Sequence, residues 1–213
     1  MAEVIRLDRM GSGTVNSKVK SAPVAPRYRN ADLQAREHLY LDEVEAMMRA
    51  AKQVGRHGHR DATLILMLFR HGFRVAEAID LRWEQIRLED RNKTIYVTRA
   101  KNGTPATHPL DRREANALRE LRKQYPDSSR VFVTERGTLL SQSVVRHIVK
   151  RAGKLAKIAF PVHPHQLRHA CGYHLANRPT DTRTIQAYLG HRNIQHTTRY
   201  TELASDRFNG LFD

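Results

Sequence analysis

Hydrophobic side chains begin to recur at helical spacing just after Tyr40, and this spacing predicts the first helix of a folded domain. Asp42 and Glu45 stand three residues apart near its start, which resembles a capping box with Asp in the Ser or Thr role. Four apolar residues recur at this spacing: Leu41, Val44, Met47 and Met48.

The stretch DATLILMLFRHGF, residues 61–73, is nearly all apolar and long enough for a buried helix. Gly72 provides a stop signal for it. VAEAIDL, residues 75–81, follows as a short helix. Arg74 is therefore expected at a junction between two helices, beside the hydrophobic core.

The pattern then changes from helical spacing to short extended runs. WEQIRLED and KTIYVTRA read as strands separated by an RNK turn, and Trp83, which opens the first, is interpreted as a core residue. Asn102-Gly103 is a turn signal, and the residues after it read as a return strand. The sequence thus predicts a small antiparallel sheet with Lys101 at a hairpin tip.

Residues 111–159 return to helical spacing, with one extended piece, RVFVTERG, between two helices. Asp111 followed by Glu114 predicts a capped helix over DRREANALRELRKQY. SQSVVRHIVKRAGKLAKIA predicts a basic amphipathic helix. Its expected core-facing stripe consists of Val144, Val145, Ile148 and Leu155. Its basic residues are left for solvent or a polyanion: Arg146, Lys150, Arg151, Lys154 and Lys157.

The last part of the domain reads as three helices. Pro164 suits the first turn of a helix that would break at Pro179, and Asp181 can cap a second helix that Gly190 stops. A final helical piece carries Tyr200. The predicted fold class is therefore mainly α with a small antiparallel sheet (α+β).

Composition divides the chain into three parts. Residues 1–38 are rich in Gly, Ser, Pro and basic side chains without periodicity, which favours a flexible basic arm or a disordered leader. Residues 39–204 form the predicted folded domain. Residues 205–213 form a tail whose apolar residues could pack on a neighbouring protomer: Phe208, Leu211 and Phe212.

Charge points to a polyanionic partner. Lys and Arg total 37 against 22 Asp and Glu, a net charge of +15, and neutralised phosphates would release counterions. A basic but idle surface is the simpler alternative. The single cysteine, Cys171, excludes an intramolecular disulfide and a Cys-based zinc cluster. No apolar run approaches the ~20 residues of a membrane span, so we expect a cytoplasmic protein.

The run from His163 to Tyr200 carries the candidate chemistry. His165 and Arg168 share a helix face at i and i+3, and His191 and Tyr200 follow within one short segment. Phosphoryl transfer needs a nucleophile, a proton for the leaving oxygen and positive charge at the non-bridging oxygens. Arginine suits the last task because its planar fork contacts two oxygens at once. Tyr200 could therefore attack a phosphodiester without a metal, while Arg168 and Arg74 stabilise its non-bridging oxygens.

A metal site built on His163, His165 and His169 is the rival interpretation. Zinc hydrolases usually add carboxylates or further histidines at fixed helical spacing, and Arg168 beside these ligands would repel a dication. We therefore expect no metal and no cofactor. Three other residues are interpreted as packing residues: Cys171, Tyr173 and Tyr188.

Five motifs in this order resemble the catalytic domain of the tyrosine recombinases, the phage integrase family. They are HGFRVAEAIDLRW around Arg74, Lys101 at a hairpin tip, HQLRH, LGH and TTRYT, and the resemblance covers roughly residues 39–204. CGYHLANR, LGHRNIQHTTRYT and RFNGLF look closest to the short recombinases that invert fimbrial promoters. The resemblance implies a recombinase catalytic-domain fold and site-specific DNA strand exchange.

The resemblance also implies a role for each matching residue. Tyr200 would form a 3′-phosphotyrosyl link, Arg74 and Arg168 would hold the non-bridging oxygens, and Lys101 would protonate the departing 5′-oxygen. His165 would assist proton transfer from the tyrosine and His191 would bond the phosphate. Two residues would support the site: Glu77 and His169. The implied partners are double-stranded DNA with short inverted repeats and a homotetramer on that DNA, in the bacterial nucleoid.

Three alternatives remain open at this point. The chain could be a transposon or phage integrase, a type IB-like topoisomerase, or a non-catalytic DNA-binding protein on the same fold. One feature departs from most of the family. About 38 residues of low complexity precede the predicted domain, where most members carry a helical core-binding domain. The fimbrial subgroup shares that feature.

Overall fold

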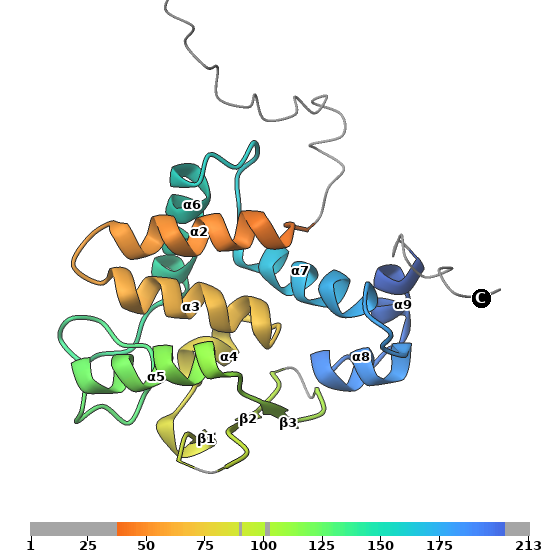
Figure 1. Ribbon diagram of the computed structural model, residues 1–213, viewed down its shortest axis with the longest axis horizontal. Coiled ribbons are helices and arrows are strands. Elements are labelled where there is room, and N and C mark those ends of the chain that lie inside the picture. The colour runs from red at the N-terminus through yellow and green to blue at the C-terminus, as the bar shows by residue number, and fades with distance from the viewer. Residues whose placement is uncertain (1–37, 90, 101–102, 203–213) are drawn as a thin grey trace, which may run out of the picture.

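Helices make up most of the structure, a computed structural model that describes residues 38–89, 91–100 and 103–202. Figure 1 shows α2, α3 and α5 stacked as three layers, with α7 leading from the centre towards α8 and α9. The helices are, in chain order, α2 (Leu41–Gln53), α3 (Gly58–Arg70), α4 (Val75–Asp80), α5 (Arg112–Gln124), α6 (Gln142–Leu155), α7 (Pro164–Ala176), α8 (Thr182–Leu189) and α9 (Gln195–Glu202).

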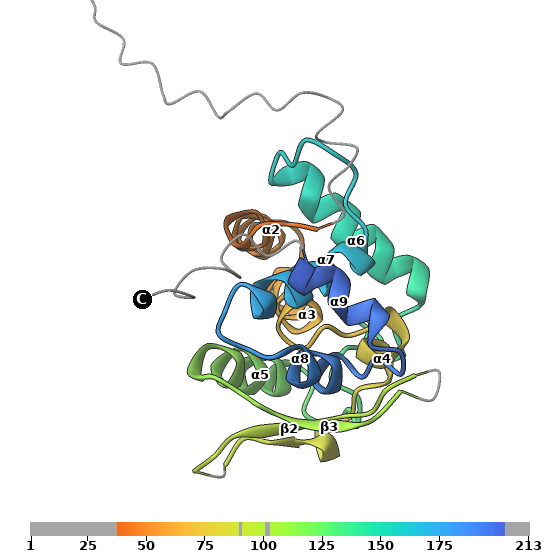
Figure 2. The same ribbon diagram turned by 90° about the vertical axis from the view of Figure 1, so that its right-hand side faces the viewer.

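A small antiparallel sheet lies below the helices, beneath α5 and α8 (Figure 2). Its strands follow the order β1 (Ile86–Arg87), β2 (Thr94–Val97) and β3 (Ala106–Pro109). β2 pairs with β3 in a register that places Ile95 opposite His108 and Val97 opposite Ala106. The α+β prediction and the hairpin that leads towards residue 101 are thus confirmed.

The central helix α3 is buried on almost every side. Its residues from Thr63 to Phe69 are all buried, and Leu64, Ile65 and Met67 are fully enclosed between α2, α5 and α7. Each fully buried side chain of this size contributes about 1.5–3 kcal/mol by leaving water. The apolar run seen in the sequence is therefore the centre of the core, and the carboxyl end of α3 is fixed where Arg74 follows.

Three helix ends are formed as the sequence predicts. Asp111 caps α5 by accepting from the N–H of Glu114, and Glu114 accepts from the N–H of Asp111 in return. Asp181 caps α8 by accepting from the N–H of Thr184 at 2.9 Å. Gly190 ends α8 in the left-handed region at φ 65°, which glycine adopts without steric cost. This turn delivers the next residue, His191, to the site.

Four local predictions are wrong. The cap of α2 lies at Tyr40, whose N–H donates to Glu43, rather than at Asp42 with Glu45. Trp83 is buried as predicted, but it does not open a strand: it begins a 3₁₀ turn, Trp83–Gln85, and β1 starts at Ile86. In RVFVTERG, pairing is limited to isolated bridges at Arg130 and Val133. Two residues of the expected α6 stripe are exposed: Val144 (39%) and Leu155 (45%).

Several predictions fall outside the described residues. These are the arm of residues 1–37, the hairpin-tip residue Lys101, and the tail with Phe208, Leu211 and Phe212. Among the described residues, no helix combines the length and apolar character that a membrane crossing requires.

Candidate active site

Tyr200 lies on α9 with its ring packed against α7. Its side chain is buried, and its hydroxyl lies 3.0 Å from Nδ1 of His169. The ring of Tyr173 meets it edge-on, with 5.1 Å between the centroids. A Cβ at Gly172 would lie 2.6 Å from the Tyr200 ring, so only glycine leaves room for it. Burial raises the pKa of Tyr200 to about 12, so the hydroxyl keeps its proton at neutral pH.

Arg168 is a fully buried arginine on α7. Its guanidinium donates to the carbonyl oxygen of Gly72, and to that of Leu189 at 2.8 Å. These bonds connect the ends of α3 and α8. Burial, with the charges of Arg74 and Arg99, lowers the pKa of Arg168 to about 10, so the group stays charged at neutral pH. The structure thus holds a positive charge beside the tyrosine.

Arg74 precedes α4 and is held by Glu77 one turn later. The carboxylate accepts from the Arg74 backbone N–H at 2.9 Å and from its guanidinium at 2.7 Å. Glu77 also accepts from the N–H of Ala100, in the hairpin that leads to residue 101. Burial works to raise the pKa of Glu77, but these donors and the charge of Arg99 more than offset it and lower the pKa. Glu77 therefore holds both the backbone and the guanidinium of Arg74 in place.

Arg99 is a site residue that the sequence reasoning missed. Its side chain is fully buried, and its guanidinium donates to Glu77 and to the His71 carbonyl, each at 3.0 Å. The signal was present in the strand alternation, because Ile95, Val97 and Arg99 share the inward face. A charged residue at a third inward position indicates a buried cation with partners.

His191 follows Gly190 and faces the same cluster. Its Nδ1 lies 2.9 Å from Oγ1 of Thr197, and its ring stacks on that of Tyr200 with 6.2 Å between centroids. Burial, then the charges of Arg168 and Arg74, lower the pKa of His191 to about 3. The imidazole is therefore neutral, and it can donate or accept one hydrogen bond at a phosphate.

The structure places His169, rather than His165, against the tyrosine hydroxyl. His165 lies in the first turn of α7 with an exposed side chain, and its ring meets that of His169 edge-on at 4.6 Å. His169 thus contacts both His165 and Tyr200. From the sequence, His169 is expected only as a supporting residue.

His163 immediately precedes α7, and its N–H donates to the side chain of Gln166 at 2.9 Å. Within the described residues, no three His, Cys, Asp or Glu side chains are arranged to hold a metal ion. Cys171 is buried as predicted, and burial raises the pKa of its thiol to about 12.

A second buried polar cluster lies at the end of α3, and the sequence does not predict it. His71 lies between His108 of β3, at 3.1 Å between the two Nδ1 atoms, and Glu114 of α5, at 3.0 Å. Burial raises the pKa of Glu114, but His71, the Asp111 N–H and Arg70 outweigh it and hold the pKa at about 2. The cluster fixes the end of α3, whose next carbonyl, that of Gly72, accepts from Arg168.

The basic helix α6 presents most of its predicted cations to solvent. Arg146, Lys150, Lys154 and Lys157 are exposed. Arg151 differs, because its guanidinium donates to the buried carboxylate of Asp61 at 2.9 Å and so anchors α6 to α3. The exposed cations of α6, with Lys157 just beyond its end, stay a predicted DNA-contacting face.

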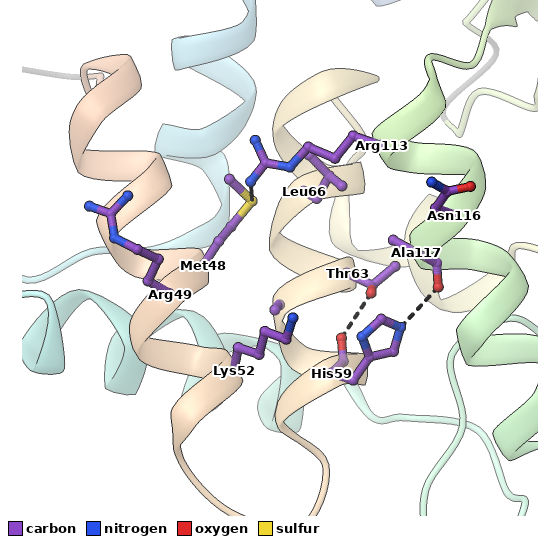
Figure 3. Close-up of a pocket in the computed structure, with 10 residues that line it drawn as sticks. Met48, Arg49, Lys52, His59, Thr63, Leu66, Arg113, Asn116 and Ala117 are labelled. Carbon is purple, nitrogen blue, oxygen red and sulfur yellow. Dashed lines mark hydrogen bonds between the residues drawn. The ribbon is translucent and has the colours of Figure 1, made fainter.

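A groove of about 420 Å³ opens between α2, α3 and α5 (Figure 3). Met48 and Leu66 form part of its apolar lining, and Arg113 and Lys52 extend over it. None of its lining residues belongs to α7, α8 or α9. The groove is therefore separate from the tyrosine cluster.

The gathered side chains define a class of chemistry. The buried guanidinium of Arg168 and the neutral imidazole of His191 lie beside the buried Tyr200. The guanidinium groups of Arg74 and Arg99 lie near that of Arg168. Positive charge placed at the oxygens of a phosphate and a hydroxyl nucleophile are the parts required for phosphodiester transesterification. The fold and this cluster are those of a DNA strand-transferase that acts through a tyrosine.

Comparison with known proteins agrees. The phage integrase family profile matches residues 37–207. The type 1 fimbriae regulatory proteins FimB and FimE of Escherichia coli K12 are each 43% identical, over 86% and 85% of this chain and 92% and 93% of theirs. The chain belongs to the phage integrase family and is a tyrosine-type site-specific DNA recombinase.

Solved structures show the same fold. The XerA recombinase superposes with a TM-score of 0.69 at 25% identity, over 80% of this chain and 62% of that one. The XerH recombinase bound to its difH substrate superposes at 0.67 and 23% identity, over 78% and 50%. The chain thus spans about half to three-fifths of these longer recombinases. The predicted family and fold are confirmed.

Proposed function

We propose that this recombinase inverts a promoter element that controls fimbrial expression. The two relatives at 43% identity bear names that describe regulation of type 1 fimbriae, and this chain matches almost their whole length. The observation that carries the chemistry is the Tyr200 hydroxyl, held by His169 beside the buried Arg168. The substrate is double-stranded DNA with short inverted repeats, bound by a homotetramer in the bacterial nucleoid.

The proposed reaction exchanges one phosphodiester for another. The Tyr200 oxygen attacks the scissile phosphorus, the bond to the 5′-oxygen breaks, and a 3′-phosphotyrosyl link and a 5′-hydroxyl remain. Arg74, Arg168 and His191 stabilise the non-bridging oxygens as charge develops there. Because the new ester conserves the bond energy, a 5′-hydroxyl from a partner strand can reverse the step without ATP or a metal.

Two proton transfers accompany the exchange. The raised pKa of Tyr200 requires a base at its hydroxyl, and His169 is in hydrogen-bond contact with it. His165, whose exposed ring meets that of His169 edge-on, assists this proton transfer from the solvent side. Lys101 supplies a proton to the departing 5′-oxygen.

The nucleophile is tested with a suicide DNA substrate in EDTA. Incubation should produce a detergent-resistant protein–DNA adduct, and Tyr200→Phe should abolish it. Tyr173→Phe is the matched control, since that ring packs against Tyr200 but lies outside the proposed chemistry. An adduct formed by Tyr200→Phe, or one that only Tyr173→Phe removes, would refute the assignment.

The biological reaction is tested with a plasmid that carries the fimbrial promoter region of the source genome between its inverted repeats. Expression of the chain should invert the segment, as read from restriction fragments. Relaxation of supercoils without inversion would instead favour a topoisomerase. Excision or insertion alone would favour an integrase.

A further inference from the structure

The buried Arg99 connects three separate parts of the active site through one guanidinium group. It donates to Glu77 and to the His71 carbonyl at 3.0 Å, and also to the carbonyls of Gly72 and Tyr188. These acceptors belong to α4, to the end of α3 and to α8. Arg99 therefore bonds to all three elements at once, and Arg168 adds a second connection between the end of α3 and α8.

Two of these acceptors are shared with the arginines that face the phosphate. Glu77 holds Arg74 as well as Arg99, and the Gly72 carbonyl accepts from Arg168 as well as Arg99. We propose that Arg99 is a positioning residue that sets the spacing between Arg74 and Arg168 for the scissile phosphate. This inference rests on the proposed function, in which those two arginines hold the non-bridging oxygens.

The backbone around Arg99 leaves room for this side chain and for little else. A Cβ at Gly190 would lie 2.6 Å from Cγ of Arg99, and a Cβ at Gly103 would lie 2.8 Å from its Cβ. Gly190 already requires a left-handed conformation at the end of α8. Both the turn before His191 and the hairpin beside residues 101–102 therefore close over the Arg99 side chain.

Charge makes the arrangement responsive to an anion. Two guanidinium groups, those of Arg74 and Arg99, pair with the carboxylate of Glu77, and the charge of Arg168 lies near it. The cluster therefore keeps a positive excess that a phosphate can neutralise. Lysine could not replace Arg99 in full, because its compact ammonium lacks the planar fork that reaches acceptors on several elements at once.

The test compares two suicide substrates that differ only at the scissile position. One carries the natural phosphodiester and the other a methylphosphonate, in which a methyl group replaces one non-bridging oxygen and removes its negative charge. Arg99→Met should slow single-turnover adduct formation on the phosphodiester about 10- to 100-fold, as displaced catalytic groups do. Its affinity for the DNA should change by less than about threefold, because many other cations contact the backbone.

On the methylphosphonate, the rates of adduct formation by Arg99→Met and by the unchanged protein should differ by no more than about threefold. This substrate no longer needs two correctly spaced guanidinium groups. Arg168→Ala is the positive control and should show the same recovery. Arg60→Met is the matched control, since Arg60 is also a buried arginine, bonded to Asp61 and the Val133 carbonyl. Any defect of Arg60→Met should be equal on both substrates.

Each outcome decides the matter. An Arg99→Met defect of equal size on both substrates, or no defect, would overturn the positioning role. If Arg99→Met does not fold, Arg99→Lys is judged by the same ratio of the two substrates. If the unchanged protein forms no adduct on either substrate, the proposed function fails, and this inference fails with it.

Discussion

At the scale of single residues, the buried Tyr200 hydroxyl links catalysis to stability. Its folded-state pKa of about 12 lies above the ordinary value near 10. A group with a raised folded-state pKa stabilises the protein fully below its unfolded pKa, and this contribution is lost as pH rises through the folded pKa. A shift of this size corresponds to about 2–3 kcal/mol.

We therefore expect the free energy of unfolding to fall by about 2–3 kcal/mol between pH 10 and pH 12 through this group alone. Urea unfolding across that range measures it. At pH 8, Tyr200→Phe should be about 1 kcal/mol less stable than the unchanged protein, because it has lost the bond to His169. Above pH 10, its free energy of unfolding should fall less steeply than that of the unchanged protein. Parallel curves for the two proteins above pH 10 would contradict the raised pKa.

The sequence identified the residues whose chemistry appears in short motifs. Arg168 and Tyr200 were predicted from their neighbours in the chain and lie together as expected. Arg99 and the His71–His108 pair were not, because their partners lie 22 to 89 residues away and belong to different elements. That His169, and not His165, contacts the tyrosine hydroxyl depends on how α9 docks on α7, which the spacing on one helix cannot reveal.

At the scale of elements, the contact between α7 and α9 depends on a glycine inside a helix. Gly172→Ala would ordinarily strengthen α7 by about 0.5–1 kcal/mol. Here the new Cβ would meet the Tyr200 ring at 2.6 Å, so the ring must move. We expect Gly172→Ala to slow adduct formation by more than about tenfold, because small displacements of a nucleophile are costly.

Gly153→Ala is the matched control for Gly172→Ala. Gly153 also lies inside a helix, α6, and its Cβ would meet the side chain of Val162 at 2.6 Å. Both variants should be destabilised in thermal unfolding, but only Gly172→Ala should lose cleavage beyond its loss of folded protein. Equal cleavage by the two variants, at equal folded fractions, would show that α9 tolerates the displacement.

The positions of the helices were easier to predict than which of their side chains are buried. The caps at Asp111 and Asp181 follow from local hydrogen bonding and were correct. The α6 stripe was wrong at both ends, where Val144 and Leu155 are exposed. Which turns of an amphipathic helix are covered depends on tertiary packing, and the pattern of one helix does not contain that information.

The basic face of α6 separates two roles that look alike in the sequence. Lys150→Gln and Lys154→Gln should each weaken DNA binding and reduce the slope of log K against log salt by about one, as lost phosphate contacts do. Arg151→Gln should instead lower the free energy of unfolding by about 1–2 kcal/mol, since it removes one of the two charge partners of the buried Asp61 and leaves Arg60 in place. Filter binding across salt concentrations and urea unfolding distinguish the two effects. A stable Arg151→Gln with a reduced salt slope would reverse the assignment.

At the scale of the whole molecule, the net charge of +15 and the buried cluster around Tyr200 are expected to affect different steps, DNA binding and strand cleavage. Affinity for DNA comes mainly from many exposed cations and falls with salt. The rate of the bound complex depends on a few buried groups that salt screens weakly. Binding and cleavage should therefore respond separately to changes in the chain.

Removal of residues 1–36 tests this separation. The family profile begins at residue 37, so the shortened chain keeps the matched domain. We expect adduct formation at saturating DNA to remain within about threefold, while affinity falls about tenfold and the salt slope decreases by about 2–4, because each lost phosphate contact reduces the slope by about 0.9. A full-length variant should show the same losses when all cations of residues 1–36 are changed to Gln, at Arg6, Arg9, Lys18, Lys20, Arg27, Arg29 and Arg36. If the shortened chain loses cleavage at saturating DNA while the Gln variant keeps it, the arm contributes to the folded site through contacts other than charge.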